Sequence, residues 1–418
     1  MKPRADLLLV DAAEVITCES QGKDWLGRLG GGTVAVGQGR VLSVGSRRQV
    51  GEVVNAEFAR VIDVRGMVVA PGFVDCHTHL VFGGTRSREY ALRLTRSVEE
   101  VRAMGIPTGI PATVVATRET GMEELTAASL ERLARMLRAG STTVESKSGY
   151  GLSMEGEFKQ LEVNARLAQA GSARVVSTFL GAHDFPPDMD RAKYLELLVE
   201  EMIPVVAEKQ LASFCDVYCD EGYYTAAESR RVLQAGLEFG LKPKIHADAY
   251  SAIGGADLAA ELGAVSADHL NYTSKEQMRR LSGAGVVGVL MPALDFAVRH
   301  PRPFDARAML DAGMTVALAT DLCPACWSES MAFAMRLACR LYGLSPEEAM
   351  LAATMGGARA LALDQEVGSL RPGKRADIQA WDLPCLEDLV YRLDFEPVRM
   401  VMVGGQVRID ERSAVVAQ

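Results

Sequence analysis

The middle of the chain alternates short apolar runs with longer amphipathic stretches. The amphipathic stretches, such as 123–140, 226–240 and 255–263, carry apolar residues at i, i+3 and i+4, which is the spacing of a helix with one buried face. Strict alternation of strand-like and helix-like segments favours parallel strands, and eight such repeats predict a (β/α)8 TIM barrel, an α/β fold. The eight apolar runs cover residues 68–80, 141–147, 174–183, 212–219, 241–246, 264–269, 286–292 and 315–321.

The two ends of the chain share a different pattern, in which β-like runs are separated by glycine-rich turns. Three runs lie near the start, at 6–17, 32–45 and 59–72, and two lie near the end, at 376–383 and 398–409. We therefore expect both ends to pair into one small β-sandwich domain built from 1–66 and 368–418. The barrel domain would then occupy 67–367 between them.

Composition and charge exclude several kinds of partner. The 418 residues are 48% hydrophobic and 24% charged, and a net charge of −9 without a basic cluster argues against nucleic acid. No window approaches the ~18 consecutive apolar residues of a membrane helix, and the apolar run at 7–10 is too short for a signal peptide. We expect a cytoplasmic protein with no membrane partner, whose eight cysteines are thiols or metal ligands.

The placement of histidines gives the first indication of chemistry. The chain has six histidines, and five of them lie at the carboxyl ends of the expected barrel strands. In a barrel those ends face a common mouth, so residues far apart in sequence converge there. Asp321 ends the eighth run in the same way. The five histidines are His77, His79, His183, His246 and His269.

Four of these side chains have the character of metal ligands. His77 and His79 are two residues apart, so both imidazoles can point to one face of a strand and bind one ion. Adding His246 and Asp321 supplies three neutral nitrogens and one carboxylate, which suits zinc or ferrous iron with a position left for water. We therefore expect one divalent metal ion, zinc or iron.

Such an ion explains catalysis without a serine or cysteine nucleophile, because it lowers the pKa of a water from ~15.7 towards ~7. Asp321 would touch both metal and water and is our candidate for taking the proton. His269 would lie one strand from His246 and is the candidate for a proton relay or electrophile at the substrate carbonyl. His300 stands beside Pro301 in an expected loop, and we expect it at the surface.

The chain resembles the imidazolonepropionase family of metal-dependent amidohydrolases over nearly its whole length. The resemblance is carried by VAPGFVDCHTHLVFGG, SKSGYGL, TFLGAHDFP, KIHADAYSAIGGADLAAELGAVSADHLNY, ALATD and GSLRPGKRADIQAWD. The family opens 4-imidazolone-5-propanoate to N-formimidoyl-glutamate in histidine breakdown. The resemblance therefore implies this activity, a small anionic heterocycle as substrate, the four metal ligands above and a catalytic His269.

The resemblance also assigns residues that hold the substrate. Arg86 in GGTRSREY, Tyr150 in KSGYG and His183 in LGAH match the substrate contacts of the family. An arginine suits a substrate with a propionate group, because a guanidinium binds a carboxylate through two hydrogen bonds. Tyr150 and His183 can each donate a hydrogen bond to a ring carbonyl or carboxylate.

Positions around the same pocket depart from the family pattern. Ala249 replaces a glutamate or glutamine that contacts the substrate ring, and Cys323 and Ala325 replace an asparagine and a glycine. The glycine-rich stretch expected near 104–112 is also altered. We hypothesise that Asp248, two residues after the histidine of the fifth strand, faces the barrel mouth if that strand continues. It would then take part of the missing catalytic role.

These departures leave alternatives open. A deaminase or cyclic-amide hydrolase acting on another heterocycle would keep the metal site and change the substrate. A non-catalytic scaffold relative is disfavoured, because such proteins typically lose metal ligands and this chain keeps all four. A second metal would need a bridging group after the fourth strand, where Asp220 and Glu221 are candidates, but that strand has no lysine and one ion is favoured. A homodimer is expected only by analogy with other barrel enzymes.

Overall fold

The computed structural model describes residues 2–20 and 24–412, and within them an eight-stranded parallel sheet confirms the expected barrel. The strand order is β15-β14-β13-β12-β11-β10-β9-β8, so neighbours in the sheet are also neighbours in the sequence. The strands are β8 (Phe73–Asp75), β9 (Ser141–Lys147), β10 (Arg174–Ala182), β11 (Phe214–Cys219), β12 (Lys242–Ala247), β13 (Ser266–His269), β14 (Val287–Leu290) and β15 (Val316–Leu318).

Hydrogen bonds connect the first and last strands of the barrel where they end. Asp75 accepts bonds from the backbone N and the Oγ1 of Thr320 at 3.1 and 2.6 Å. Just beyond, the backbone N of Asp321 donates to the carbonyl of His77 at 3.1 Å. These bonds bring the segment after β8 beside the segment after β15, although some 240 residues of chain separate them.

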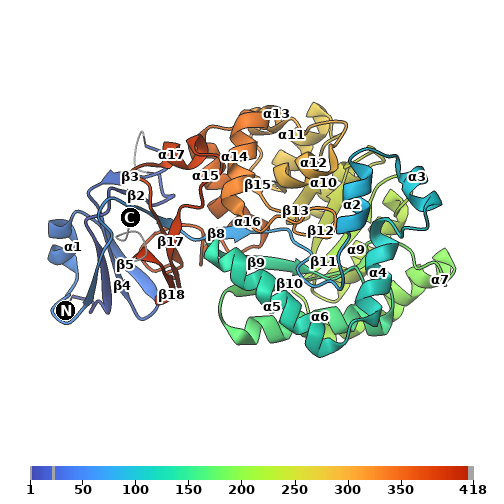
Figure 1. Cartoon of the computed structure of the whole chain (residues 1–418), viewed down its shortest axis with the longest axis horizontal. Coiled ribbons are helices and arrows are strands. Elements are labelled where there is room, and N and C mark those ends of the chain that lie inside the picture. The colour runs from blue at the N-terminus through green and yellow to red at the C-terminus, as the bar shows by residue number, and fades with distance from the viewer. Residues whose placement is uncertain (1, 21–23, 413–418) are drawn as a thin grey trace.

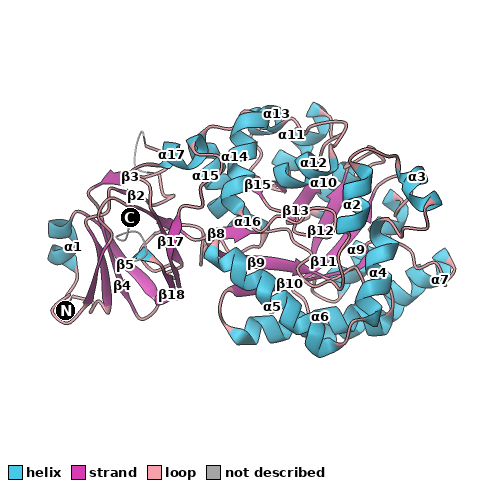
Figure 2. Cartoon of the chain, viewed as in Figure 1, coloured by secondary structure: helices cyan, strands magenta, loops and turns pink. Residues whose placement is uncertain are grey.

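Helices cover the outside of the barrel (Figures 1 and 2). In α5, Leu125, Leu133 and Met136 recur on one helical face and are buried. The helices between the strands are α2 (Ser87–Arg93), α3 (Val98–Ala103), α4 (Gly109–Glu119), α5 (Met122–Arg138), α6 (Met154–Ala170), α7 (Arg191–Glu196), η1 (Leu197–Met202), α8 (Ile203–Glu208), α9 (Ala226–Glu238), α10 (Gly255–Leu262), α11 (Lys275–Gly283), α12 (Pro292–Val298) and α13 (Ala306–Asp311). After β15 follow α14 (Met331–Tyr342), α15 (Pro346–Leu351), η2 (Ala352–Gly356) and α16 (Gly357–Ala360).

Both ends of the chain meet in two packed sheets beside the barrel, seen in Figure 1 as adjacent blue and red strands. The order β18-β17-β16-β7-β2-β3 mixes strands from both ends, whereas β5-β4-β1-β6 comes from the first part of the chain. Leu9, Val34 and Ile62 of the second sheet share one core with Val69 and Met400 of the first, as in the expected sandwich. The elements are β1 (Leu7–Val10), β2 (Glu14–Ile16), β3 (Arg28–Gly30), β4 (Thr33–Gly37), β5 (Arg40–Gly45), α1 (Arg47–Val53), β6 (Arg60–Asp63), β7 (Val68–Pro71), β16 (Ile378–Trp381), α17 (Leu386–Tyr391), β17 (Val398–Val403) and β18 (Gln406–Asp410).

The apolar run 68–80 does not form one strand. Its first part, β7, pairs with β16 in the terminal sheet, and its second part, β8, pairs with β9 in the barrel. Gly72 lies between them against Thr142, where an added Cβ would lie only 2.2 Å from Oγ1, so the crossing requires glycine. The last residues of the expected C-terminal segment, 413–418, lie outside the described residues.

Two smaller expectations concern membranes and cysteines. Among the helices of the described chain, none combines the length and apolarity required to cross a membrane. All eight cysteines are free thiols, as expected. Cys323 and Cys326 exchange two backbone hydrogen bonds of 3.0 Å across a tight turn, which fixes the loop that follows Asp321.

Candidate functional site

The structure brings the five strand-end histidines together at one end of the barrel. The ring centroids of His77 and His246 are 4.5 Å apart, those of His79 and His183 are 4.8 Å apart, and those of His246 and His269 are 5.2 Å apart. All five side chains are buried. The convergence predicted from their positions at strand ends is observed.

The four predicted ligands fall into overlapping groups of nearby ligand atoms. Ligand atoms of His77, His79 and Asp321 lie within 4.8 Å of one another. The Nε2 atoms of His77 and His79 are each 3.7 Å from Oδ1 of Asp321. A ring nitrogen of His246 lies within the same 4.8 Å of nitrogens of both histidines. This His and Asp cluster is able to hold a metal ion.

Two buried carboxylates orient two of these histidines. Nδ1 of His77 lies 2.6 Å from Oδ2 of Asp268, and Nδ1 of His246 lies 3.2 Å from Oδ1 of Asp216. A carboxylate accepts the proton of the nearer ring nitrogen, which leaves the Nε2 lone pair free on the other side. Histidines that bind metals are typically held in this way.

The fit of a cation can be judged from buried atoms that lack partners. Nε2 of His77, Nε2 of His246 and Oδ1 of Asp321 accept or donate no hydrogen bond within the described ranges of the chain. Each such atom costs about 1–3 kcal/mol when left unpaired. Burial lowers the pKa of both histidines well below the ordinary value, so they are neutral, and it raises the pKa of Asp321 to about 7. A divalent cation would satisfy all three atoms and favour the ionised carboxylate, so these residues fit one.

His183 and Tyr150 form one wall beside the histidines. The Tyr150 ring is 5.2 Å from that of His183 and 5.4 Å from that of His79. Nδ1 of His183 lies 3.0 Å from the carbonyl of Gly149, whose φ of +109° and close approach to His183 require glycine. Glu157 of α6 accepts a backbone hydrogen bond from Gly149 at 3.0 Å, and two more from Gly151 and Leu152 at 2.8 Å each. The motif SKSGYGL therefore encodes the loop that places Tyr150.

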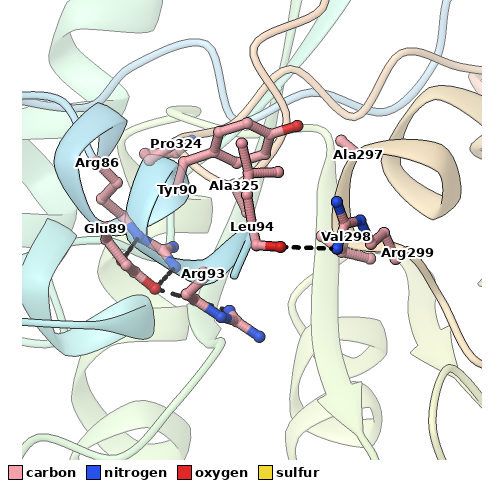
Figure 3. A pocket seen from close by; sticks show the side chains of 10 residues that line it. All are labelled: Arg86, Glu89, Tyr90, Arg93, Leu94, Ala297, Val298, Arg299, Pro324 and Ala325. Carbon is pink, nitrogen blue, oxygen red and sulfur yellow. Dashed lines mark hydrogen bonds and ion pairs between the residues drawn. The ribbon is translucent and has the colours of Figure 1, made fainter. Parts of the chain in front are cut away.

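Arg86 precedes α2 and borders a small pocket (Figure 3). Its Nε and Nη2 donate to both oxygens of Glu89 at 2.6 and 2.8 Å, and Glu89 is buried. The guanidinium is thus fixed by its own helix, while its Nη1 bonds to no group in the described chain and can still bind a ligand carboxylate. The rest of the pocket is lined by Tyr90, Arg93 and Leu94 of α2, by Ala297, Val298 and Arg299 around the end of α12, and by Pro324 and Ala325.

The expected continuation of the fifth strand through Asp248 is wrong. Strand β12 ends at Ala247, and Asp248 has a left-handed backbone with φ +54°. Its Oδ2 accepts a hydrogen bond of 2.8 Å from Oγ1 of Thr273, and its carbonyl accepts one of 2.8 Å from the backbone N of Tyr272. The side chain therefore holds the segment that follows His269.

Three further residues, His300, Asp220 and Glu221, differ from their expected place or suggested role. His300 is half-buried rather than fully at the surface, because the loop after α12 packs its ring 4.6 Å from that of Tyr250.

Asp220, a candidate bridge for a second metal, instead accepts hydrogen bonds from the backbone N of Tyr250 at 2.7 Å and from the hydroxyl of Ser251. Glu221 is exposed beside it. Neither acidic residue belongs to a metal-binding group of the described chain.

The positions that depart from the family pattern lie inside the protein. Ala249 and Cys323 are 2% and 5% exposed, and Ala325 lines the pocket beside Arg86. A methyl group and a thiol offer no strong hydrogen bond to a substrate. The polar contacts that this region can make must therefore come from other residues.

Sequence reasoning missed the charged residues inside the barrel strands. The sequence does carry a signal for them, because these charged residues stand within runs expected to form buried strands. Lys244 lies two residues before His246, and Asp268 lies directly before His269. Fully buried charges in strands are rare unless they are paired. The residues are Glu145, Lys147, Asp216, Lys244 and Asp268.

Comparison with known proteins identifies the family of the chain. The model of the Amidohydrolase family matches residues 220–408. The imidazolonepropionase of Geobacillus kaustophilus is 43% identical over 394 residues, 92% of each chain, and that of Symbiobacterium thermophilum is 43% identical over 423 residues, 98% of this chain and 99% of the other. An adenosine deaminase from Xanthomonas campestris, solved with bound zinc, shares the fold with a TM-score of 0.76 at 20% identity, covering 100% of this chain and 96% of that one. As its motifs indicated, the chain belongs to the imidazolonepropionase family of amidohydrolases.

Proposed function

We propose that this protein hydrolyses 4-imidazolone-5-propanoate to N-formimidoyl-L-glutamate in histidine degradation. The reaction adds one water across a C–N bond of a cyclic amide, and the ring opens without release of ammonia. The observation that carries the proposal is the set of three buried ligand atoms without partners, on His77, His246 and Asp321. The names of the curated relatives support the choice of substrate.

The proposal includes one divalent ion, zinc or iron, held by His77, His79, His246 and Asp321. When bound, such an ion would supply Lewis acidity, which lowers the pKa of water so that its deprotonated form can attack a carbonyl at neutral pH. The neutral state of the histidines supports this role, because protonated imidazole cannot bind a metal. Imidazole and carboxylate ligands serve both metals, so the choice of metal depends partly on supply.

Two residues move protons in the proposed reaction. Asp321 takes the proton of the attacking water, since its Oδ1 is directed at the same volume as the ligand histidines. His269 passes a proton between the water and the leaving ring nitrogen, or polarises the carbonyl. Its ring lies 5.5 Å from that of His77 and is 8% exposed. Burial lowers the pKa of His269 to about 4, so it is neutral at pH 7 and can accept a proton.

Three residues bind the substrate in this proposal. Arg86 binds the propionate through Nη1 while Glu89 holds the other edge of the guanidinium. Tyr150 donates a hydrogen bond to the ring from the wall beside His79. His183 accepts one through Nε2, because its Nδ1–H donates to the carbonyl of Gly149. A fixed cation suits an anionic substrate in a chain whose net charge is −9.

Asp248 contributes to catalysis by positioning rather than by proton transfer. Its hydrogen bond to Thr273 supports this role, because Thr273 follows His269 by four residues and both lie in the segment after β13. The contact that the family makes through a glutamate or glutamine at position 249 is then left without a substitute in this chain.

A second activity on another heterocycle, including deamination, is favoured by one observation. Ala249 and Cys323, two buried positions that depart from the family pattern, cannot make strong hydrogen bonds to an imidazolone ring. Such a site would keep the metal and accept a ring with different polar groups.

An assay distinguishes the two activities. Purified protein would be incubated with 4-imidazolone-5-propanoate beside a panel of cyclic ureas and amidines, with and without chelator, while ultraviolet absorbance and ammonia are followed. The proposal predicts loss of imidazolone absorbance without ammonia, abolished by the chelator. Ammonia release from another heterocycle, with no imidazolone turnover, would favour the deaminase. The cytoplasmic location and the homodimer remain predictions, and sedimentation velocity tests the latter.

A further inference from the structure

Five charged side chains form a wholly buried cluster inside the barrel. Nζ of Lys147 lies 2.7 Å from Oδ2 of Asp216, 3.0 Å from Oε2 of Glu145 and 3.5 Å from Oδ2 of Asp268. Nζ of Lys244 lies 3.0 Å from Oε1 of Glu145. Burial alone would lower the pKa of Lys147, but the three carboxylates outweigh it and raise that pKa, so the ammonium is charged. Each of the five side chains is 0% exposed.

Two carboxylates connect Lys147 to the histidines of the site. Asp216 contacts Nδ1 of His246 on β12, and Asp268 contacts Nδ1 of His77 after β8. The same oxygen of Asp268 faces both the ammonium and His77. Lys147 therefore lies behind the histidines and touches neither of them.

The five side chains of the cluster leave one negative formal charge, because three carboxylates face two ammonium groups. Asp321 and Asp75 are further buried carboxylates nearby. A divalent cation at the histidines would offset part of this negative charge. Without Lys147, Asp216 on β11 and Asp268 on β13 would lose the ammonium that contacts both of them, and like charges in a dry interior repel strongly.

We infer that Lys147 is a positioning residue of the metal site: its ammonium holds Asp216 and Asp268 where they orient the Nε2 atoms of His246 and His77. The inference rests on the proposed function only in that the histidines hold a metal. Lys147 makes no contact with substrate in this arrangement. Its removal should change how the metal is bound, beyond any effect on stability.

The test compares cobalt binding by the wild-type chain, Lys147→Met and Lys374→Met, each prepared without metal. Lys374 is the matched control, because it is 1% exposed and its Nζ bonds to the carbonyl of Val367 at 3.1 Å, away from the histidines. The dissociation constant of Co²⁺ is measured by competition with a chelator, and the visible absorption spectrum reports the coordination. We expect Lys147→Met to weaken binding by roughly 10- to 100-fold, as outer partners of metal ligands do, and to alter the spectrum. Lys374→Met should change neither.

A wild-type constant and spectrum in Lys147→Met would overturn the inference. If that variant does not fold, Lys147→Gln, which keeps a hydrogen-bond donor and removes the charge, is measured instead. The inference then requires at least ~10-fold weaker cobalt binding by folded Lys147→Gln, by the same reasoning, and unchanged binding contradicts it. Failure of the wild-type chain to take up cobalt would defeat the proposed metal function itself. Cobalt binding without imidazolone turnover would defeat only the proposed substrate.

Discussion

Oδ2 of Asp268 lies 2.6 Å from Nδ1 of His77, and both side chains are wholly buried. The neighbour of Asp268 in the sequence, His269, ends strand β13 and is 8% exposed, and its ring lies 5.5 Å from that of His77. The motif SADH thus supplies two adjacent residues with separate tasks. One orients a metal ligand, and the other is available to the substrate.

Replacing Asp268 by asparagine should weaken metal binding. The variant keeps the shape of the side chain but removes the charge that favours the Nδ1–H form of His77, so zinc affinity should fall by roughly 10- to 100-fold. Competition with a chromophoric chelator measures this. Asp257→Asn, at a partly exposed ion pair with Arg280, is the control and should bind zinc as the wild-type chain does. Equal affinity in Asp268→Asn would show that the 2.6 Å contact does not govern the ligand.

Arg86→Lys should raise KM far more than it lowers kcat. A lysine loses the fork that lets Glu89 fix one edge while another edge binds the substrate carboxylate. Hydrogen bonds to a charged group contribute about 1.5–3 kcal/mol, so KM should increase by roughly 10- to 100-fold. Steady-state kinetics on 4-imidazolone-5-propanoate check the split. Arg88→Lys, exposed on the same helix, should leave both parameters unchanged, and a similar result for Arg86→Lys would remove it from substrate binding.

Asp248→Asn should reduce turnover without changing metal content. Asparagine can still accept a hydrogen bond from Thr273, but the uncharged group holds the segment after His269 less firmly, and a loss of about 1 kcal/mol corresponds to roughly fivefold in kcat. Thr273→Val, which removes the other partner, should produce a loss of the same size, and the double variant should lose no more than either alone. Unchanged turnover in Asp248→Asn would exclude the residue from the mechanism.

The ion pair between Glu228 and Arg191 predicts a pH dependence of stability. Arg191 donates to both oxygens of Glu228 at 2.7 and 2.6 Å, and these bonds lower the pKa of Glu228 from 4.5 to about 2. Because the folded-state pKa lies below the unfolded value, the pair stabilises the fold above about pH 4.5, and this stabilisation is lost as the pH falls towards 2.

Both partners of this pair are partly exposed, so it contributes no more than about 1 kcal/mol to the free energy of unfolding. Urea unfolding of Glu228→Gln should show that deficit at pH 7 and a smaller one at pH 3. Glu238→Gln, exposed on the same helix, serves as the control. A deficit of equal size at both pH values would contradict the assignment.

The barrel and the convergence of the candidate ligands could be predicted, because their signals lie in short segments of the sequence and in the barrel topology. Period-two spacing places His77 and His79 on one face, and strand ends of a parallel barrel meet at one mouth, so His246 and Asp321 follow from topology. The roles of Glu145 and Lys147 could not be predicted in this way. Their partners come from other strands, and only the barrel register brings an ammonium between two carboxylates.

The failed expectation at Asp248 has a physical cause of the same kind. The sequence does not reveal where β12 ends, and a left-handed residue at that point directs the carboxylate to Thr273 instead of the barrel mouth. Glu89 was also missed, because its bond to Arg86 depends on the first turn of a short helix. The directions of the Asp248 and Glu89 side chains thus depend on where a strand ends and where a helix begins.

The central claim is that His77, His79, His246 and Asp321 together hold one divalent ion. Elemental analysis of the wild-type chain and His246→Ala, purified side by side without added metal, tests it most directly. We predict one equivalent of zinc or iron per wild-type chain and less than about a tenth of that in the variant, since losing a ligand lowers affinity steeply. Equal metal content in both proteins, or none in the wild-type chain, would contradict the account.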